Sequence, residues 1–161
     1  MRFRLLMLAA LVAALVPATA LGNGNKMREL YASLNGQNET PKGDPKATGK
    51  AEIKLDAATG KVCWDFTLKG VSGPNAAHIH KGKPGTAGAV VIPFGTAFKR
   101  EGCTTASKAL IAAILARPSA YYVNVHTSKY PAGSVRGQLS RSDNSSKSDS
   151  SKKKSGGGYT Y

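Results

Sequence analysis

Two stretches of the sequence decide the fold: Ala77–Val91 (AHIHKGKPGTAGAVV) and Tyr121–Leu139 (YYVNVHTSKYPAGSVRGQL). In each stretch a run of alternating apolar and polar residues ends at a histidine, and a loop that contains Gly and Pro follows. A small residue and a valine then begin a second run. Alternation with a period of two is typical of half-buried β-strands, and loops of this composition join antiparallel neighbours. Each stretch therefore predicts a strand–loop–strand unit.

Further strands are expected on the N-terminal side of these units. Glu29–Leu34 and Gly49–Leu55 alternate, and Lys61–Lys69 (KVCWDFTLK) alternates again after the turn Asp56–Gly60. The last two runs and the turn between them predict a β-hairpin.

One segment departs from the β-pattern. Ser107–Leu115 (SKALIAAIL) predicts a short helix, which Ser107 caps and which ends before Pro118. Many short strands with Gly-rich turns predict a mainly β protein. We expect a Greek-key β-sandwich or barrel with this one helix inserted.

The first twenty residues have the features of a secretory signal peptide. Arg2 and Arg4 are basic, Leu5–Val16 is a twelve-residue apolar stretch, and Ala18–Ala20 supplies an A-x-A cleavage pattern. Twelve apolar residues are too few to span a bilayer comfortably, which disfavours an uncleaved anchor. No later segment is long and apolar enough to be transmembrane. The chain is therefore predicted to be secreted, and so extracellular or periplasmic.

The rest of the chain divides into one domain and a tail. Residues 27–140 are long enough for a hydrophobic core, whereas residues 141–161 (RSDNSSKSDSSKKKSGGGYTY) are basic, poor in apolar residues and expected to be disordered. The formal net charge is +14. The lysines are scattered and lack the interleaved aromatic residues of a base-stacking surface, so we expect no nucleic-acid partner. An extracellular protein or an acidic envelope polymer is the expected partner class.

The two cysteines, Cys63 and Cys103, are expected to form a disulfide in an oxidising compartment. The alternative is a pair of free thiols. A disulfide would close a loop of about forty residues, which the chain-entropy account equates with roughly 3–4 kcal/mol of stability.

Five motifs follow one another along the chain: Leu34–Pro41 (LNGQNETP), Ala77–Gly82 (AHIHKG), Gly88–Val91 (GAVV), Tyr122–Thr127 (YVNVHT) and Arg136–Leu139 (RGQL). Taken in order, these motifs resemble the CHRD domain, the module repeated in chordin and found singly in many secreted bacterial proteins. The resemblance runs from about residue 29 to residue 139, with Thr40 and Ser134 as departures where aliphatic and acidic residues are common. It implies an extracellular β-domain of poorly defined molecular activity and does not imply an enzyme.

At the level of the fold, the histidine-bearing segments also look like copper/zinc superoxide dismutase. A superoxide-dismutase-like or an immunoglobulin-like arrangement of strands is therefore expected. A dismutase centre uses six histidines and an aspartate, whereas this chain has three histidines, so the complete centre cannot be assembled.

The three histidines His78, His80 and His126 are the candidate metal ligands. Because side chains alternate along a strand, His78 and His80 project from one face, opposite the apolar residues, and His126 also lies opposite its valine neighbours. An H-x-H pair with a remote histidine suits a mononuclear copper or zinc site. The alternative is that the histidines donate to loop carbonyls and hold the two loops. No fourth ligand is selected by spacing, although Glu39 and Asp65 are available.

Arg136 and Asn124 are the candidate binding residues. Arg136 follows a turn and can hold a carboxylate or phosphate with two hydrogen bonds, or else bond loop carbonyls or Glu39 within the domain. Asn124 shares its strand face with His126. Of Tyr121 and Tyr122, one is expected in the core and the other at the surface.

The sequence contains no Gly-x-Ser-x-Gly motif and no close carboxylate pair in a cleft-like loop, so it offers no catalytic residues for hydrolysis. Two functions remain from different classes. The first is a non-catalytic extracellular binding or structural module. The alternative is a mononuclear copper or zinc protein with a redox or metal-handling role.

Overall fold

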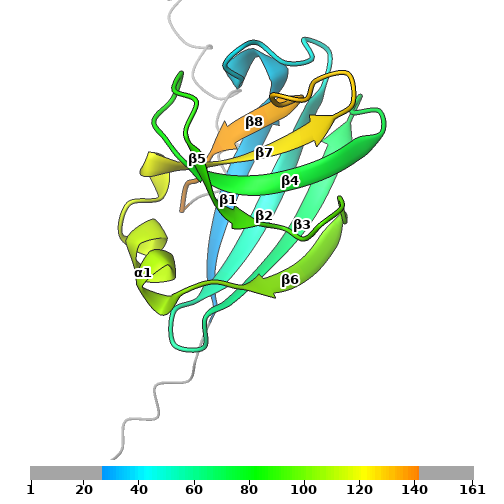
Figure 1. Cartoon of the computed structure of the whole chain (residues 1–161). Helices are drawn as coiled ribbons and strands as arrows, with labels where there is room; N and C mark the ends of the chain where they lie inside the picture. Colours follow the sequence, from blue (N-terminus) through cyan, green and yellow to red (C-terminus); the bar gives the residue numbers. More distant parts are fainter. Residues whose placement is uncertain (1–26, 142–161) are drawn as a thin grey trace, which may run out of the picture.

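Eight antiparallel strands form one sheet in the computed structural model, which describes residues 27–141 (Figure 1). The order across the sheet is β5-β4-β7-β8-β1-β2-β3-β6. A mainly β protein is therefore confirmed, and its runs of alternating residues are the observed strands. The strands are β1 (Arg28–Asn35), β2 (Thr48–Asp56), β3 (Lys61–Lys69), β4 (Pro74–Lys81), β5 (Ala89–Pro93), β6 (Glu101–Thr105), β7 (Tyr121–Thr127) and β8 (Val135–Gln138).

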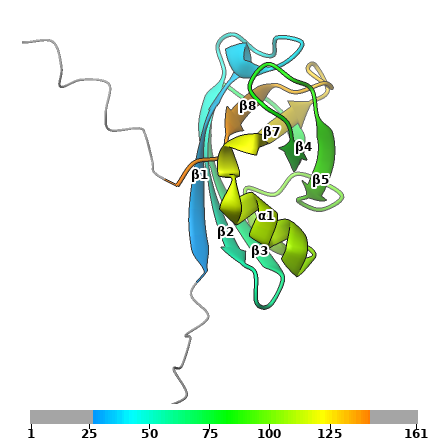
Figure 2. The ribbon, with the colours of Figure 1, turned by 90° about the vertical axis from the view of Figure 1, so that its left-hand side faces the viewer.

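The sheet curls into a half-barrel, consistent with the predicted sandwich or barrel. Strands β4, β7 and β8 cross in front of β1, β2 and β3, so the two halves of the same sheet face each other (Figures 1 and 2). Trp64 on β3 stacks on Phe94, which follows β5, with ring centroids 4.6 Å apart. This aromatic pair joins two strands that lie near opposite ends of the sheet order.

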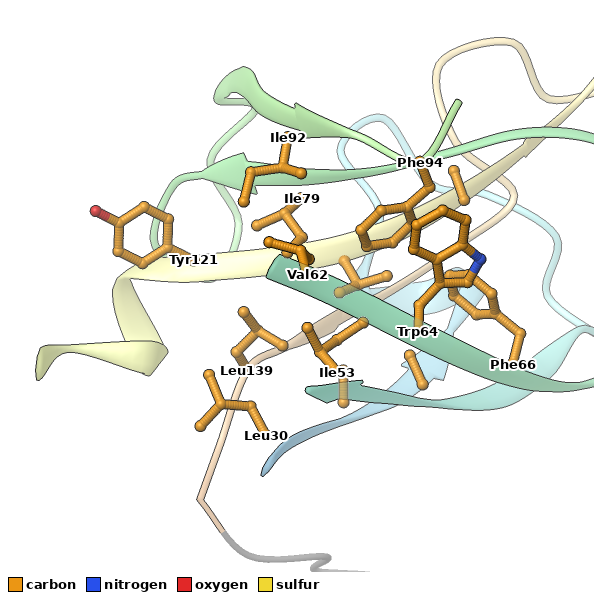
Figure 3. Packing of buried hydrophobic residues seen from close by; sticks show 14 of the residues in the cluster. Leu30, Ile53, Val62, Trp64, Phe66, Ile79, Ile92, Phe94, Tyr121 and Leu139 are labelled. Atoms are coloured by element: carbon orange, nitrogen blue, oxygen red, sulfur yellow. The ribbon is translucent and has the colours of Figure 1, made fainter. Parts of the chain in front are cut away.

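The hydrophobic core fills the space inside the curl (Figure 3). Its residues are the inward members of each alternating strand, and each fully buried aliphatic or aromatic side chain contributes about 1.5–3 kcal/mol. Strands β4, β7 and β8 supply Ala77, Ile79, Tyr121, Val123, Val125 and Val135, and strands β1, β2 and β3 supply Leu30, Leu34, Ile53, Leu55, Val62, Trp64 and Phe66.

The short helix α1 (Lys108–Ala116) lies beside β2, where Figure 2 shows it against the open side of the curl. Ser107 is its N-cap, as predicted, and its hydroxyl accepts a hydrogen bond from the Leu110 amide at 3.2 Å. Ile111 and Ile114 are buried in the core. Two short 3-10 helices, Gly36–Asn38 and Pro118–Ala120, complete the helical elements of residues 27–141.

The strands β2 and β3 form the predicted hairpin, with Asp56 paired to Lys61 across the turn. Strand β6 (EGCTT) was not predicted, because it is short, polar and bears no clear alternation. It pairs with β3 and places Cys103 directly opposite Cys63, with the two Cα atoms 4.0 Å apart. The predicted Cys63–Cys103 disulfide is confirmed.

The predicted signal peptide (residues 1–20) and all but the first residue of the predicted tail lie outside the described residues. Within residues 27–141, no helix has the length and apolar character needed to cross a membrane.

Candidate metal centre

The outer face of β4, β7 and β8 is polar where the inner face is apolar. The register pairs His80 with Tyr122 and Tyr122 with Gln138, and in the next row it pairs His78 with Asn124 and Asn124 with Arg136. Because these residues alternate with the core residues, they share the face that points away from the core. The three strands thereby bring polar groups far apart in sequence onto one surface.

The three histidines meet on this face. Nδ1 of His78 lies 3.1 Å from Nε2 of His126, and one ring nitrogen from each histidine lies within 4.8 Å of the others. In the described part of the chain, no carboxylate or thiol joins this cluster. Neither Glu39 nor Asp65 therefore supplies the fourth ligand that the sequence left open. The alternation of side chains predicted that His78 and His80 share one face of their strand. The pairing of β4 with β7 brings His126 beside them.

Two of the imidazole rings are oriented by backbone carbonyls. Nδ1 of His80 donates to the Gly88 carbonyl at 2.8 Å, and Nδ1 of His126 donates to the Pro131 carbonyl at 3.0 Å. Carbonyl oxygens can only accept, so each neutral ring carries its proton on Nδ1 and its lone pair on Nε2. Histidines that bind metals commonly have this support on the second ring nitrogen.

The tautomer of His126 has a consequence for its neighbours. Nε2 of His126 lies 3.1 Å from the Asn124 side-chain amide and 3.1 Å from His78 Nδ1. Since this nitrogen is an acceptor, Asn124 turns its NH2 group toward it or His78 donates its own N–H. The lone pair of His126 is thus aimed at His78 rather than at bulk solvent.

Nε2 of His80 is the least satisfied atom of the cluster. It is buried and has no partner within hydrogen-bond distance, although the Asn124 side chain lies near enough for a weak hydrogen-bonding interaction that raises the pKa of the ring. A buried acceptor without a partner destabilises the folded chain by about 1–3 kcal/mol. A metal ion at this position would use that lone pair.

The loop over the cluster is held by the strands beneath it. Arg136 donates from Nη1 to the Thr86 carbonyl at 2.9 Å and from Nη2 to the Lys83 carbonyl at 2.8 Å. Gly88 allows the end of this loop to approach β4, since a Cβ there would lie 1.8 Å from the Lys81 carbonyl oxygen. This close approach presents the Gly88 carbonyl to His80.

A stack of three side chains supports the His80 ring. The Tyr122 ring lies parallel to the imidazole of His80, with centroids 4.8 Å apart and planes within 9°. The guanidinium carbon of Arg136 lies 3.4 Å from the centroid of the Tyr122 ring. Because β4 and β8 flank β7, these contacts come from opposite sides of Tyr122.

Arg136 has the internal role that the sequence left as one of two alternatives. It is 1% exposed, and Asn124 is also 1% exposed. The expectation that one of the two tyrosines lies at the surface is wrong, because Tyr121 and Tyr122 are 5% and 3% exposed. Both faces of β7 are covered, the outer one by loops, and alternation alone cannot show that coverage.

The histidine pKa values are all lowered. Burial is the main cause for each ring, and the neighbouring His126 and His80 act in the same direction on His78, whose pKa falls to about 4. A neutral imidazole is the form that binds a metal ion. At neutral pH the cluster therefore offers lone pairs without first having to lose protons.

Glu39 lies close to the second histidine loop, outside the cluster. A Cβ on Gly133, whose φ is +141°, would lie 2.2 Å from Glu39 Oε1, so glycine is needed for the loop to pass over this carboxyl group. Burial raises the pKa of Glu39 to about 7, against the opposing charge of Arg136. Sequence reasoning named Glu39 as a possible ligand and missed this packing role.

The cluster fits a small metal ion in its donor atoms and nearly in its spacing. Metal–nitrogen bonds of about 2.0–2.1 Å place three nitrogens around one ion at mutual distances of about 3.5 Å. His78 Nδ1 and His126 Nε2, 3.1 Å apart, are already closer than this, whereas the cluster as a whole spans up to 4.8 Å, so the rings have to shift to hold one ion. His78 is the ring best able to move, since its ring nitrogen bonds His126 and neither of the loop carbonyls that hold the other two histidines.

Fold and site together define a small antiparallel β-domain, closed by one disulfide, with a three-histidine cluster under the loops of its outer face. The family model of the CHRD domain matches residues 30–139, which is most of the chain. The chain belongs to the CHRD-domain family, as its motifs indicated. Comparisons with curated proteins and with solved structures found no match.

Proposed function

We propose that this CHRD-domain protein is a non-catalytic extracellular module that binds one copper or zinc ion through His78, His80 and His126. The observation that carries the proposal is that ring nitrogens of all three histidines converge at one place. Two rings are fixed by carbonyls on Nδ1, which leaves the lone pair of each on Nε2, and one nitrogen from each of the three rings lies within 4.8 Å of the others.

Loop anchoring alone is the competing explanation. It accounts for the Nδ1 hydrogen bonds of His80 and His126, which hold the two loops. It does not account for the buried, unpaired Nε2 of His80. Nor does it account for His78, whose ring nitrogen bonds His126 rather than a loop. A metal ion bound by all three rings would account for both observations.

The extracellular location is supported by two findings. The chain belongs to the CHRD family, and the Cys63–Cys103 disulfide needs an oxidising compartment to persist. The signal peptide proposed for residues 1–20 would take the chain there.

The test uses residues 21–161, the mature chain expected after cleavage of the signal peptide, made metal-free with a chelator and then dialysed. Elemental analysis and titration calorimetry with zinc, and with copper under reducing and oxidising conditions, are expected to give one ion per chain. His78→Ala is expected to abolish binding while lowering the unfolding free energy of the metal-free chain by less than about 1 kcal/mol, since this ring anchors neither of the two loops. Lys81→Ala, an exposed neighbour on the same strand, serves as the control and retains the ion.

Absence of metal from the unsubstituted chain under every condition would overturn the proposal. The loop-anchoring explanation would then predict that His80→Ala and His126→Ala destabilise the chain, with loss of the Gly88 and Pro131 hydrogen bonds, whereas His78→Ala does not.

A further inference from the structure

We infer that the three-histidine cluster selects copper(I) over zinc and copper(II). This inference rests on the proposed metal function and deepens it by naming the ion. It is carried by the charge of the site, by its number of ligands and by the way its rings are held.

The first argument is charge. All three ligands are neutral imidazoles, and no carboxylate or thiolate of the described residues lies in the cluster. The nearest fixed charge along the outer face is the cation Arg136, which reaches His80 through the Tyr122 ring. A divalent ion in this half-buried site would keep its full charge beside another cation. The cost of burying an ion rises with the square of its charge, so a monovalent ion is disfavoured far less.

The second argument is the number of ligands. Structural zinc sites have four protein ligands, and zinc sites with three protein ligands complete the set with water. The described residues place three nitrogens together and no fourth donor. Copper(I) has a filled d shell and accepts three nitrogens in a plane, so this set is complete for it, whereas zinc would need a water molecule as a fourth ligand.

The third argument is how the rings are held. The Gly88 and Pro131 carbonyls fix the rings of His80 and His126, and the Arg136–Tyr122 stack supports His80 from one side. Copper(II) favours a tetragonal arrangement of ligands. Three nitrogens, two of them on rings that these carbonyls hold in place, leave the fourth position of a tetragonal set without a protein donor, so oxidised copper is disfavoured.

The experiment compares affinities on the metal-free mature chain. Copper(I) is titrated anaerobically in competition with the chromophoric chelator bicinchoninate, and zinc is titrated against a chromophoric zinc chelator at the same pH. We expect one copper(I) per chain and a dissociation constant at least a thousandfold below that of zinc. X-ray absorption of the copper(I) form is expected to show three nitrogen neighbours.

Zinc binding within tenfold of copper(I), or a copper(II) form of equal affinity, would overturn the selectivity and leave the proposed metal function standing. Failure to bind any of the three ions would overturn both. The two failures are therefore distinct.

A substitution tests the charge argument directly. Asn124→Asp keeps the shape of the side chain and places a carboxylate where the amide now lies, 3.1 Å from His126 Nε2. Zinc affinity is expected to rise at least tenfold relative to copper(I). Lys69→Gln makes the same change in net charge at an exposed end of β3, remote from the cluster, and is expected to leave the ratio unchanged. Equal ratios in the two variants would contradict the charge argument, and should Asn124→Asp fail to fold, the affinities of the unsubstituted chain still decide the inference.

Discussion

The two faces of β7 and β8 are both almost wholly buried, yet they are buried in different ways. On the inner face, Ile79, Val123 and Val125 pack into an apolar core that needs no particular partner atoms. On the outer face, Asn124 and Arg136 are covered by loops, and each buried polar atom needs its own hydrogen bond. The inner face therefore stabilises the fold through the apolar surface area that it buries. The outer face fixes the positions of the loops and of the histidine rings through directional hydrogen bonds.

Adjacent residues on one strand expose this difference most clearly. His78, Ile79 and His80 lie side by side on β4 and alternate between the two faces. Substitutions that perturb one face at a time therefore have different consequences for stability and for metal binding.

The inner face is broken by Ile79→Ala. Ile79 is fully buried, so the change removes apolar contacts and leaves a cavity, and the unfolding free energy is expected to fall by about 2–5 kcal/mol. Urea unfolding of the metal-free chain measures it. Where the variant remains folded, the histidine cluster still binds its ion. A loss below about 1 kcal/mol would show that this part of the core can collapse around the cavity.

The outer face is broken by Arg136→Met, which retains much of the apolar stem. The Lys83 and Thr86 carbonyls lose their donors, and we expect a loss of about 2–4 kcal/mol. The freed loop no longer presents the Gly88 carbonyl to His80, so metal affinity is expected to fall as well. Arg136→Lys is the matched control for charge. It keeps the cation and loses the two-point fork, so a full rescue by lysine would contradict the role given to the fork.

The pH dependence of the stability of the metal-free chain reports on the outer face without any substitution, because the three histidines lie on that face. Because the folded pKa of each histidine is below its ordinary value, the unfolded chain binds more protons as the pH falls. The histidines therefore do not change the free energy of unfolding with pH above about pH 6.5, and they lower it as the pH falls from there toward 4. After allowance for solvent screening, the loss is about 1–3 kcal/mol. Denaturant unfolding between pH 4 and pH 7 measures it, and replacing the three histidines together is expected to flatten the curve.

Glu39 gives a smaller effect of the opposite sign. Its folded pKa is raised from 4.5 to about 7, so the folded chain binds the extra proton, and stability falls as the pH rises through that window. Glu39→Gln is expected to remove this fall and to stabilise the chain by about 1 kcal/mol at pH 8, with no change at pH 4. Metal affinity is expected to be unchanged, because the carboxyl group lies outside the histidine cluster. A destabilised variant at pH 8 would show that the ionised carboxylate is needed beside Arg136.

Period-two alternation predicted much of the inner face. It located the strands, the hairpin of β2 and β3 and the core residues of β4 and β7, and the Ser107 cap identified the start of α1. Strand β6 escaped because its polar residues owe their conformation to pairing with β3 rather than to their own pattern. A local sequence pattern can predict a strand whose own residues alternate between core and solvent. It cannot predict β6, which becomes a strand because it pairs with β3.

The outer face was predicted only in part. Alternation placed the three histidines opposite the core, but their convergence depends on β4 pairing with β7, two segments separated by about forty residues. The burial of Tyr122 and Arg136 depends on a loop that folds back over the strands, and no local sequence signal reports such coverage. The carbonyls that orient His80 and His126 belong to the backbone, which carries no sequence signature at all.

The disulfide has a meaning beyond the stability it adds. Strand β6 covers the edge of β3, and Cys63 and Cys103 fasten that cover in place. In a reduced chain β6 would keep its ladder and the flanking hydrogen bonds from Trp64 to the Lys99 carbonyl and from Phe66 to the Arg100 carbonyl, but it would lose its covalent link to β3. Whenever β6 detached, the edge of KVCWDFTLK would be open to strand addition by another copy. The first effect of reduction is therefore expected to be self-association of the chain. The disulfide thus protects against aggregation as well as stabilising the fold.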